Sequence, residues 1–176
     1  MRPIFLIGYM GCGKSTLGRM VSSLTGIDFI DLDNYIEGRY HASVSQLFAE
    51  RGEHGFRDLE RAMLHEVGEF EDVIVACGGG TPCFFDNMDW MNAHGTTVFL
   101  DTSTDKLFAR LKRGRHKRPL IADKTDDELR EFIITALDGR MPHYSKAAIV
   151  FKSDLMESES EKLATGRRFV EELNIH

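Results

Sequence analysis

The sequence predicts one α/β domain in which helices cover both faces of a five-stranded parallel sheet. The first observation is the length of 176 residues, which is typical of one domain. The second is that short apolar runs alternate with helix signals along the whole chain. The third is that no internal repeat, low-complexity tract or linker interrupts this alternation. Residues 1–176 are therefore expected to form a single domain.

Five short apolar runs are the expected strands. They lie at 3–7, 28–33, 73–76, 97–100 and 148–151. Gly8 closes the first run, Asp31 and Asp33 end the second, and Gly78–Gly80 follow the third almost directly. Because strands separated by helices are joined by right-handed crossovers, the sheet is expected to be parallel.

Helix signals fill the intervals between these runs. Lys14–Leu24 has apolar residues at helical spacing, and Gly26 stands where a C-terminal cap belongs. A further helix is expected near Asp105–Lys112. Capping boxes, in which Ser or Thr is followed three residues later by Gln or Glu, predict three more helix starts. They lie at 43–46, 125–128 and 158–161, and the helices that the first and last open are expected to reach Val67 and Leu173.

Composition and charge exclude several classes of protein. The chain has 22 Lys and Arg against 28 Asp and Glu, a net charge of −6, which argues against a general nucleic-acid binder. The three cysteines, Cys12, Cys77 and Cys83, form no C-x-x-C pair, so a reducing, cytoplasmic location is expected rather than a disulfide framework or a zinc site. No apolar run approaches the length of a membrane span, and the run after Arg2 is too short for a signal peptide.

The segment Gly8–Ser15 matches the phosphate-binding pattern G-x-x-x-x-G-K-[ST], between an expected strand and an expected helix. Its glycines allow backbone N–H groups to turn inward around phosphate oxygens. Lys14 is expected to reach the β- and γ-phosphates, and Ser15 to bind Mg²⁺. A dinucleotide fingerprint fails because Thr16 stands where it requires glycine. A purine nucleoside triphosphate is therefore the expected ligand, with a plain glycine-rich turn as the alternative.

Acidic residues at strand ends are candidates for the second anchor of Mg²⁺. Asp31 and Asp33 would face one side together if the second strand continues through Leu32. Asp101 follows the fourth strand and is the other candidate. An exposed strand end is the alternative for Asp31 and Asp33, and a strand-end or helix-capping acid is the alternative for Asp101.

Three further features suit a ligand. Gly78–Gly80 at the end of the third strand allow close approach of a ligand to the backbone. Arg57 and Glu60 share a helix face, where a plain surface ion pair is the alternative. The stretch 110–120 holds six basic residues, which fit either a solvated helix end or a mobile loop that closes over phosphate. Arg140 and Tyr144 follow the next expected helix.

Taken together, these motifs resemble the shikimate kinase family. The segments that carry the resemblance are GYMGCGKS, DLD, FRDLE, CGGG, RPL and RMPHY, and they span most of the chain in this order. The resemblance implies a nucleoside-monophosphate-kinase-like fold with strand order 2-3-1-4-5, a substrate-binding region at about 33–60 and a mobile lid at about 113–124. It also implies Mg²⁺- and ATP-dependent phosphorylation of the shikimate 3-hydroxyl, in chorismate and aromatic amino-acid biosynthesis.

The resemblance also implies a role for each matching residue. Ser15 and Asp31 would hold the metal, and Lys14, Asp33 and Arg118 would be catalytic. ATP would contact Gly11, Cys12, Gly13, Lys14, Ser15, Thr16, Arg110 and Arg118. Shikimate would contact Asp33, Arg57, Glu60, Gly79, Gly80 and Arg140. A monomer that binds neither nucleic acid nor membrane is expected.

The sequence departs from the family's pattern at several positions. The interval between Arg110 and Arg118 is one residue longer, so Arg113 and Arg115 are also candidates to stack on adenine. Thr81-Pro82 follow the glycines in place of small apolar residues, and His143 replaces a common leucine. A gluconate kinase, a nucleoside-monophosphate kinase and a nucleotide-binding regulatory module remain alternatives.

Overall fold

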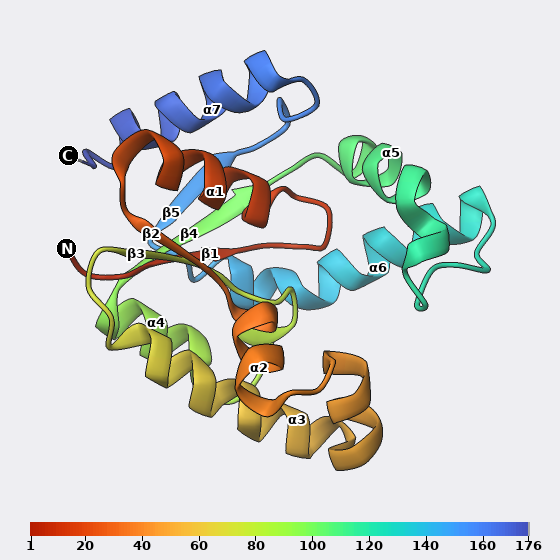
Figure 1. Cartoon of the computed structure of the whole chain (residues 1–176). Coiled ribbons are helices and arrows are strands. Elements are labelled where there is room, and N and C mark those ends of the chain that lie inside the picture. Colours follow the sequence, from red (N-terminus) through yellow and green to blue (C-terminus); the bar gives the residue numbers. More distant parts are fainter. Residues whose placement is uncertain (176) are drawn as a thin grey trace.

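The computed structural model describes residues 1–175, which form a three-layer α/β/α domain around a parallel sheet (Figure 1). The strand order is β2-β3-β1-β4-β5, as the resemblance implies. The strands of these residues are β1 Ile4–Ile7, β2 Asp28–Asp31, β3 Val73–Ala76, β4 Thr96–Asp101 and β5 Ile149–Lys152. The predicted fold class is therefore confirmed.

Alternate side chains of the central strand enter two separate hydrophobic cores. Ile4 and Leu6 pack on the side of α1 (Lys14–Thr25) and α7 (Glu159–Glu172). Phe5 and Ile7 pack on the opposite side, against α3 (Val44–Gly68) and α4 (Asn87–His94). Successive side chains of a strand point to opposite faces, and here both faces are covered. The continuous apolar run PIFLI is explained by burial on both sides.

The expected helix starts are confirmed. All three capping boxes form, with reciprocal side-chain and backbone bonds, at the beginnings of α3, α6 (Asp126–Tyr144) and α7. Gly26 ends α1 with φ of 80°, the left-handed conformation typical of a glycine C-cap. Helix α5 covers Thr104–Gly114. Gly52 interrupts α3 with φ of 69° and ψ of 176°.

The structure corrects the prediction for the second strand. Strand β2 ends at Asp31, and helix α2 (Leu32–Tyr40) begins at the next residue. The Asp31 carboxylate accepts a hydrogen bond from Asn34 N at 3.3 Å and so caps this helix. Asp33 therefore lies in the first turn of α2 and not on a strand. Helix α4, which no capping signal precedes, is also absent from the sequence prediction.

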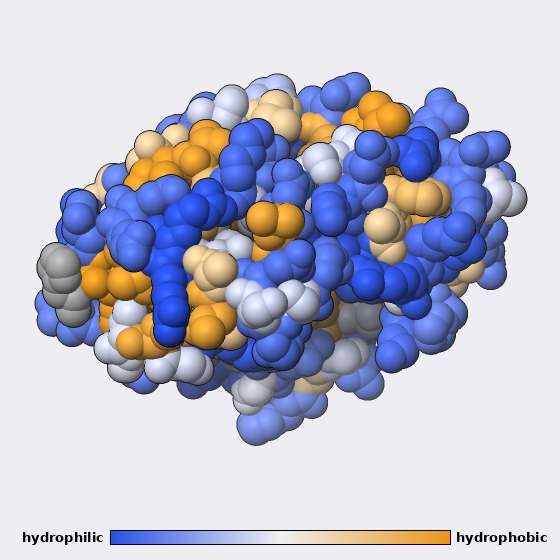
Figure 2. All heavy atoms as spheres, turned by 90° about the horizontal axis from the view of Figure 1, so that it is seen from above, coloured by the Kyte–Doolittle hydropathy of each residue, from blue (hydrophilic) through white to orange (hydrophobic). Residues whose placement is uncertain are grey.

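The carboxyl end of the sheet lies between two projections of the molecule (Figure 1). One consists of α5 and the segment after it, with the short 3-10 helix Arg115–Lys117, and the other of α2 and the first part of α3. On the face shown in Figure 2, polar and charged side chains cover most of the surface, and hydrophobic ones form small separate patches. Within residues 1–175, no helix combines the length and the apolar character needed to cross a membrane.

Candidate active site

The phosphate loop, Gly8–Ser15, has the conformation that its glycines predict. Gly8, Gly11 and Gly13 have φ values of 145°, 81° and 97°, which L side chains rarely adopt. The Lys14 ammonium lies within the loop, where its Nζ donates to the carbonyl oxygens of Gly8 at 2.7 Å and Tyr9 at 3.1 Å. Gly13 precedes α1, so the positive end of that helix faces the loop. The alternative of a plain turn does not account for this arrangement.

A cleft of about 330 Å³ lies over the phosphate loop. Its walls come from the loop, from α5, from the segment after α5 and from the segment after β5. The residues that line it are Gly11, Gly13, Lys14, Ser15, Thr16, Arg110, Arg118, Met156 and Glu157. The fold thus brings together every predicted ATP-binding residue except Cys12, whose side chain points elsewhere.

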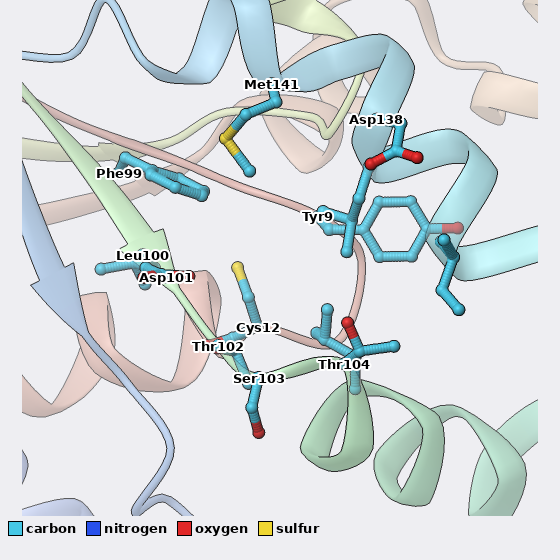
Figure 3. A pocket seen from close by; sticks show the side chains of 13 residues that line it. Tyr9, Cys12, Phe99, Leu100, Asp101, Thr102, Ser103, Thr104, Asp138 and Met141 are labelled. Carbon is cyan, nitrogen blue, oxygen red and sulfur yellow. Dashed lines mark hydrogen bonds between the residues drawn. The ribbon is translucent and has the colours of Figure 1, made fainter. Parts of the chain in front are cut away.

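A second hollow, of about 250 Å³, lies beside the phosphate loop and shares no lining residue with the cleft. Figure 3 shows Cys12 and Thr102–Thr104 on one side of it, with Met141 of α6 across from them. Cys12 is only 1% exposed. The loop therefore presents its Cys12 thiol away from the cleft, although the Cys12 backbone belongs to the loop.

Asp31 is the acid that meets the phosphate loop. Ser15 Oγ donates a hydrogen bond to Asp31 Oδ2 at 2.6 Å. Asp101, the other candidate, instead forms an ion pair with Lys152 of β5. Hydroxyl and carboxylate oxygens are hard ligands that suit Mg²⁺, which usually takes one or two protein side chains and completes its shell with phosphate and water. Ser15 and Asp31 fit that requirement.

Asp33 lies near four charged groups, Asp31, Glu60, Lys14 and Glu37, and its carboxyl is poorly solvated. Burial raises the pKa of Asp33 to about 6, with further contributions from the negative charges of Asp31 and Glu60, while the Lys14 ammonium acts in the opposite direction. Two acids and a lysine from three different elements are thus electrostatically coupled. A carboxyl with a raised pKa in such a position is typical of a functional site.

The glycine triplet, Gly78–Gly80, lies where these groups converge. A Cβ atom on Gly78 would lie 3.4 Å from Asp33 Oδ1, and one on Gly79 would lie 2.9 Å from an Arg140 guanidinium nitrogen. A Cβ atom on Gly80 would lie 2.7 Å from Arg57 Nη2. The carbonyl oxygen of Gly8, in the phosphate loop, would be 3.5 Å from the Cβ on Gly79. The triplet therefore lies between the predicted acceptor-binding side chains and the phosphate loop, close to both.

Arg57 and Glu60 are not a surface ion pair. Arg57 Nη1 donates to Glu60 Oε1 at 2.8 Å, and their side chains are 14% and 2% exposed. The guanidinium lies over the Phe84 ring, 4.0 Å from its centroid, and within 5.5 Å of the ring centroids of Phe48 and Phe56. Aromatic faces attract a cation, so the three rings hold the guanidinium close while the Glu60 carboxylate accepts from it.

Arg140 and Tyr144 lie in the last turns of α6, not after it, at a spacing of four residues. The Arg140 guanidinium is 5.2 Å from the centroid of the Tyr9 ring. The buried Tyr144 hydroxyl donates to the carbonyl oxygen of Gly79 at 2.6 Å. Helix α6 therefore both supplies a guanidinium to the site and fixes the middle peptide of the glycine triplet. The motif RMPHY indicated Arg140 and Tyr144, but nothing in the sequence indicated that the Tyr144 hydroxyl would bond to Gly79.

The three arginines that are candidates to stack on adenine have different partners. Arg110 donates to Glu157 at 2.6 Å and to the backbone oxygens of Gly11, Ser153 and Asp154. Arg113 also pairs with Glu157, from an exposed position. Arg115 donates to the Lys124 carbonyl oxygen at 2.7 Å and pairs with Asp126. Of the three candidates to stack on adenine, Arg110 is therefore the one that lines the cleft.

A phosphate loop that faces carboxylates and two guanidinium groups across a glycine triplet, on a sheet of order 2-3-1-4-5, defines a P-loop kinase of a small acceptor. The family model described as shikimate kinase matches residues 10–172. The chain belongs to the shikimate kinase family. It catalyses the ATP-dependent phosphorylation of shikimate in aromatic amino-acid biosynthesis.

Individual relatives agree with this assignment. A shikimate kinase of Phocaeicola vulgatus is 55% identical over 174 residues, which are 99% of each chain. The crystal structure of shikimate kinase from Bacteroides thetaiotaomicron matches with a TM-score of 0.93 and 50% identity over 98% of each chain. Shikimate kinase from Acinetobacter baumannii in complex with shikimate matches with a TM-score of 0.84 and 26% identity, over 99% of this chain and 93% of that one.

Proposed function

We propose that the triphosphate of ATP lies on the phosphate loop and that shikimate lies across the glycine triplet, with its 3-hydroxyl toward Asp33. The observation that carries this proposal is the triplet itself. Its three Cβ positions would meet Asp33, Arg140 and Arg57, and the middle one lies close to the Gly8 oxygen of the phosphate loop. An acceptor bound there would have its alcohol and its carboxylate contacted at once, next to the phosphates.

On the nucleotide side, backbone N–H groups of Gly11–Thr16 would bind the phosphates, and Lys14 would neutralise charge on the β- and γ-phosphates. Arg118 would reach the same phosphates from the lid, and Arg110 would stack on adenine. Ser15 and Asp31 would hold Mg²⁺, Asp31 through water. Bound Mg²⁺ would neutralise charge developing on the β- and γ-oxygens. The direct Ser15–Asp31 contact and the cleft that Arg110 and Arg118 share with the loop support these roles.

On the acceptor side, Arg57 and Arg140 would bind the shikimate carboxylate, because a guanidinium offers paired donors to two oxygens. Glu60 orients Arg57 at 2.8 Å and would also accept from a shikimate hydroxyl. Gly79 and Gly80 would donate backbone N–H groups. Arg57 keeps donors available for this task, since its hydrogen bond to Glu60 uses Nη1 alone.

Charge neutralisation is expected to contribute more to the rate than proton removal. Phosphoryl transfer has a loose transition state in which the acceptor alcohol loses its proton late. A positioned arginine is worth about 10³–10⁵ in rate, and a general base about 10²–10⁴. Lys14 and Arg118 therefore rank above Asp33, which would orient the 3-hydroxyl and take its proton.

A coupled assay of ADP release tests the proposal directly. Shikimate, quinate, gluconate and AMP are supplied as acceptors at equal concentrations, with and without Mg²⁺. Of the four acceptors, we expect only shikimate to be turned over fast, and we expect this turnover to require Mg²⁺. Equal turnover with gluconate or AMP would contradict the acceptor assignment, and ATP binding without turnover would point to a regulatory module instead. Sedimentation in the same buffer tests the proposed monomer.

Arg140→Ala is expected to raise the KM for shikimate by about ten- to one hundred-fold, because a charge-assisted bond to the carboxylate contributes about 1.5–3 kcal/mol. The KM for ATP is expected to change less than twofold. Arg130→Ala is the matched control, because Arg130 lies on the same helix but pairs with Asp105 at the surface. A variant that weakens ATP alone would place Arg140 with the nucleotide.

The raised pKa of Asp33 predicts a titration near pH 6 in the protein free of metal and nucleotide. Carboxyl ¹³C NMR should show this titration. Asp33→Asn should abolish it, and Glu60→Gln should lower its midpoint, because the Glu60 charge contributes to the shift.

The same raised pKa predicts a pH dependence of stability. The folded protein binds this proton more tightly than the unfolded chain, so the stability that Asp33 contributes falls as pH rises through about 4 to 6. Asp33→Asn should therefore raise Tm at about pH 8 but not at about pH 4. An NMR midpoint for the Asp33 carboxyl near pH 4 would contradict both predictions.

A further inference from the structure

Thr81, the residue that follows the glycine triplet, is completely buried beside the acceptor site. Its hydroxyl donates a hydrogen bond to Glu60 Oε2 at 2.7 Å. Its backbone is fixed on both sides, since Thr81 N donates to Gly78 O at 3.1 Å and Asn87 Nδ2 donates to Thr81 O at 2.8 Å. The Thr81 hydroxyl therefore stands at a defined position relative to the triplet and to α4.

The two oxygens of the Glu60 carboxylate have different partners. Oε1 accepts from Arg57, and Oε2 accepts from Thr81. The Glu60 residue is 1% exposed, so water cannot readily replace either donor. A buried carboxylate needs hydrogen-bond donors on its oxygens, and the two bonds together fix the plane of this carboxylate.

The orientation of the Arg57 guanidinium depends on the orientation of the Glu60 carboxylate. The Nε of Arg57 is buried and has no hydrogen-bond partner among residues 1–175. Its guanidinium is located by Glu60 and by the Phe84 ring at 4.0 Å. An aromatic face sets the distance of a guanidinium above it but restricts its rotation only weakly. The hydrogen bond that Arg57 Nη1 donates to Glu60 Oε1 is therefore what orients the guanidinium.

We propose that Thr81 is a positioning residue for the acceptor, which acts through Glu60 to set the orientation of Arg57. The inference rests on the proposed function, in which Arg57 binds the shikimate carboxylate. Thr81 itself touches none of the reacting atoms in this assignment. A small apolar residue at this position could not make the bond, so the hydroxyl is what the inference depends on.

Thr81→Val tests the inference, because valine keeps the branched shape and removes the donor. We expect the KM for shikimate to rise about five- to twenty-fold, since a bond to a charged group is lost. The kcat and the KM for ATP are expected to stay within twofold. Thr81→Ser, which restores the hydroxyl, should return the KM for shikimate to near the wild-type value.

Two controls separate positioning from a loss of stability. Thr97→Val removes another fully buried hydroxyl, which accepts from Ala148 N at 2.8 Å at the amino end of β4, and should lower Tm without changing either KM. In a Glu60→Gln background, Thr81→Val should change the KM for shikimate much less than in the wild type, because residues that act as one unit are not additive.

The outcomes distinguish this inference from the proposed function. An unchanged KM for shikimate in Thr81→Val, or a fall in kcat alone, would overturn the inference. Additive effects of Thr81→Val and Glu60→Gln would do the same, as would failure of both Thr81→Val and Thr81→Ala to fold, which would show a structural role. Arg57→Ala is measured in parallel, and if it leaves the KM for shikimate unchanged, the proposed acceptor site itself is wrong.

Discussion

Arg118→Ala is expected to lower kcat by about 10³-fold or more, because a positioned arginine stabilises charge on the transferred phosphoryl group. Arg118 lines the cleft above the phosphate loop together with Lys14 and Ser15. The KM for shikimate should change little, since Arg118 lines the cleft over the phosphate loop and not the region around the glycine triplet. Steady-state kinetics with both substrates varied, and single-turnover rates at saturating ATP, measure the two effects separately.

Arg115→Ala is the matched control for this experiment. Arg115 lies in the same segment but is bonded to the Lys124 carbonyl oxygen and to Asp126, at the start of α6. Its replacement should leave kcat within about threefold of the wild type. Equal losses in the two variants would show that the basic residues of this segment act together rather than singly, and the specific role of Arg118 would be wrong.

Lys14→Ala is expected to lower kcat by about 10²–10³-fold or more, the loss seen when one positioned donor to a developing charge is removed. The effect should fall on chemistry and on ATP binding, while thermal shift with shikimate alone remains close to wild type. Lys14 Nζ also bonds to two carbonyl oxygens of the loop, so a moderate fall in Tm is expected as well.

Lys112→Ala serves as the control, because Lys112 is half exposed and pairs with Asp126 on the surface. Surface ion pairs contribute little to stability, so its kinetics and Tm should match the wild type. A near-normal kcat in Lys14→Ala would show that the phosphates of ATP do not bind at the phosphate loop. It would therefore contradict the assignment of the cleft.

Elements with local sequence signals could be predicted in advance. Each of the three capping boxes supplies its own reciprocal bonds within four residues. The phosphate loop likewise depends on glycines that are close in sequence and adopt positive φ. Such features need no information from the rest of the chain, and the structure has them where the sequence predicted them.

Elements that depend on tertiary contacts could not be predicted in the same way. The alternation of acids around Leu32 fits a strand, but Asp31 accepts from Asn34 N and starts α2 instead. Helix α4 has no side-chain cap, and it is stabilised by burial of Met88 and Met91 in the core that α3 shares. Tertiary packing overrides local preference in both cases.

The candidate site was predictable as a set of residues but not as a set of contacts. The motifs indicated Arg57, Glu60 and Arg140, which the fold places around the glycine triplet. The bonds from Thr81 to Glu60 and from Tyr144 to Gly79 span 21 and 65 residues. The stacking of Phe84 on Arg57 is of the same kind. No spacing rule reaches across such separations.

The lack of free space around the glycine triplet limits which substitutions could give this enzyme another acceptor. Any side chain at Gly79 or Gly80 would collide with a guanidinium group, so mutation cannot change the base of the proposed acceptor site without displacing an arginine. By contrast, the sequence can drift at Gly38 and Gly139, where a Cβ atom would meet nothing within 4 Å. A new acceptor preference would have to arise from the walls that α3 and α6 provide, while the base stays unchanged.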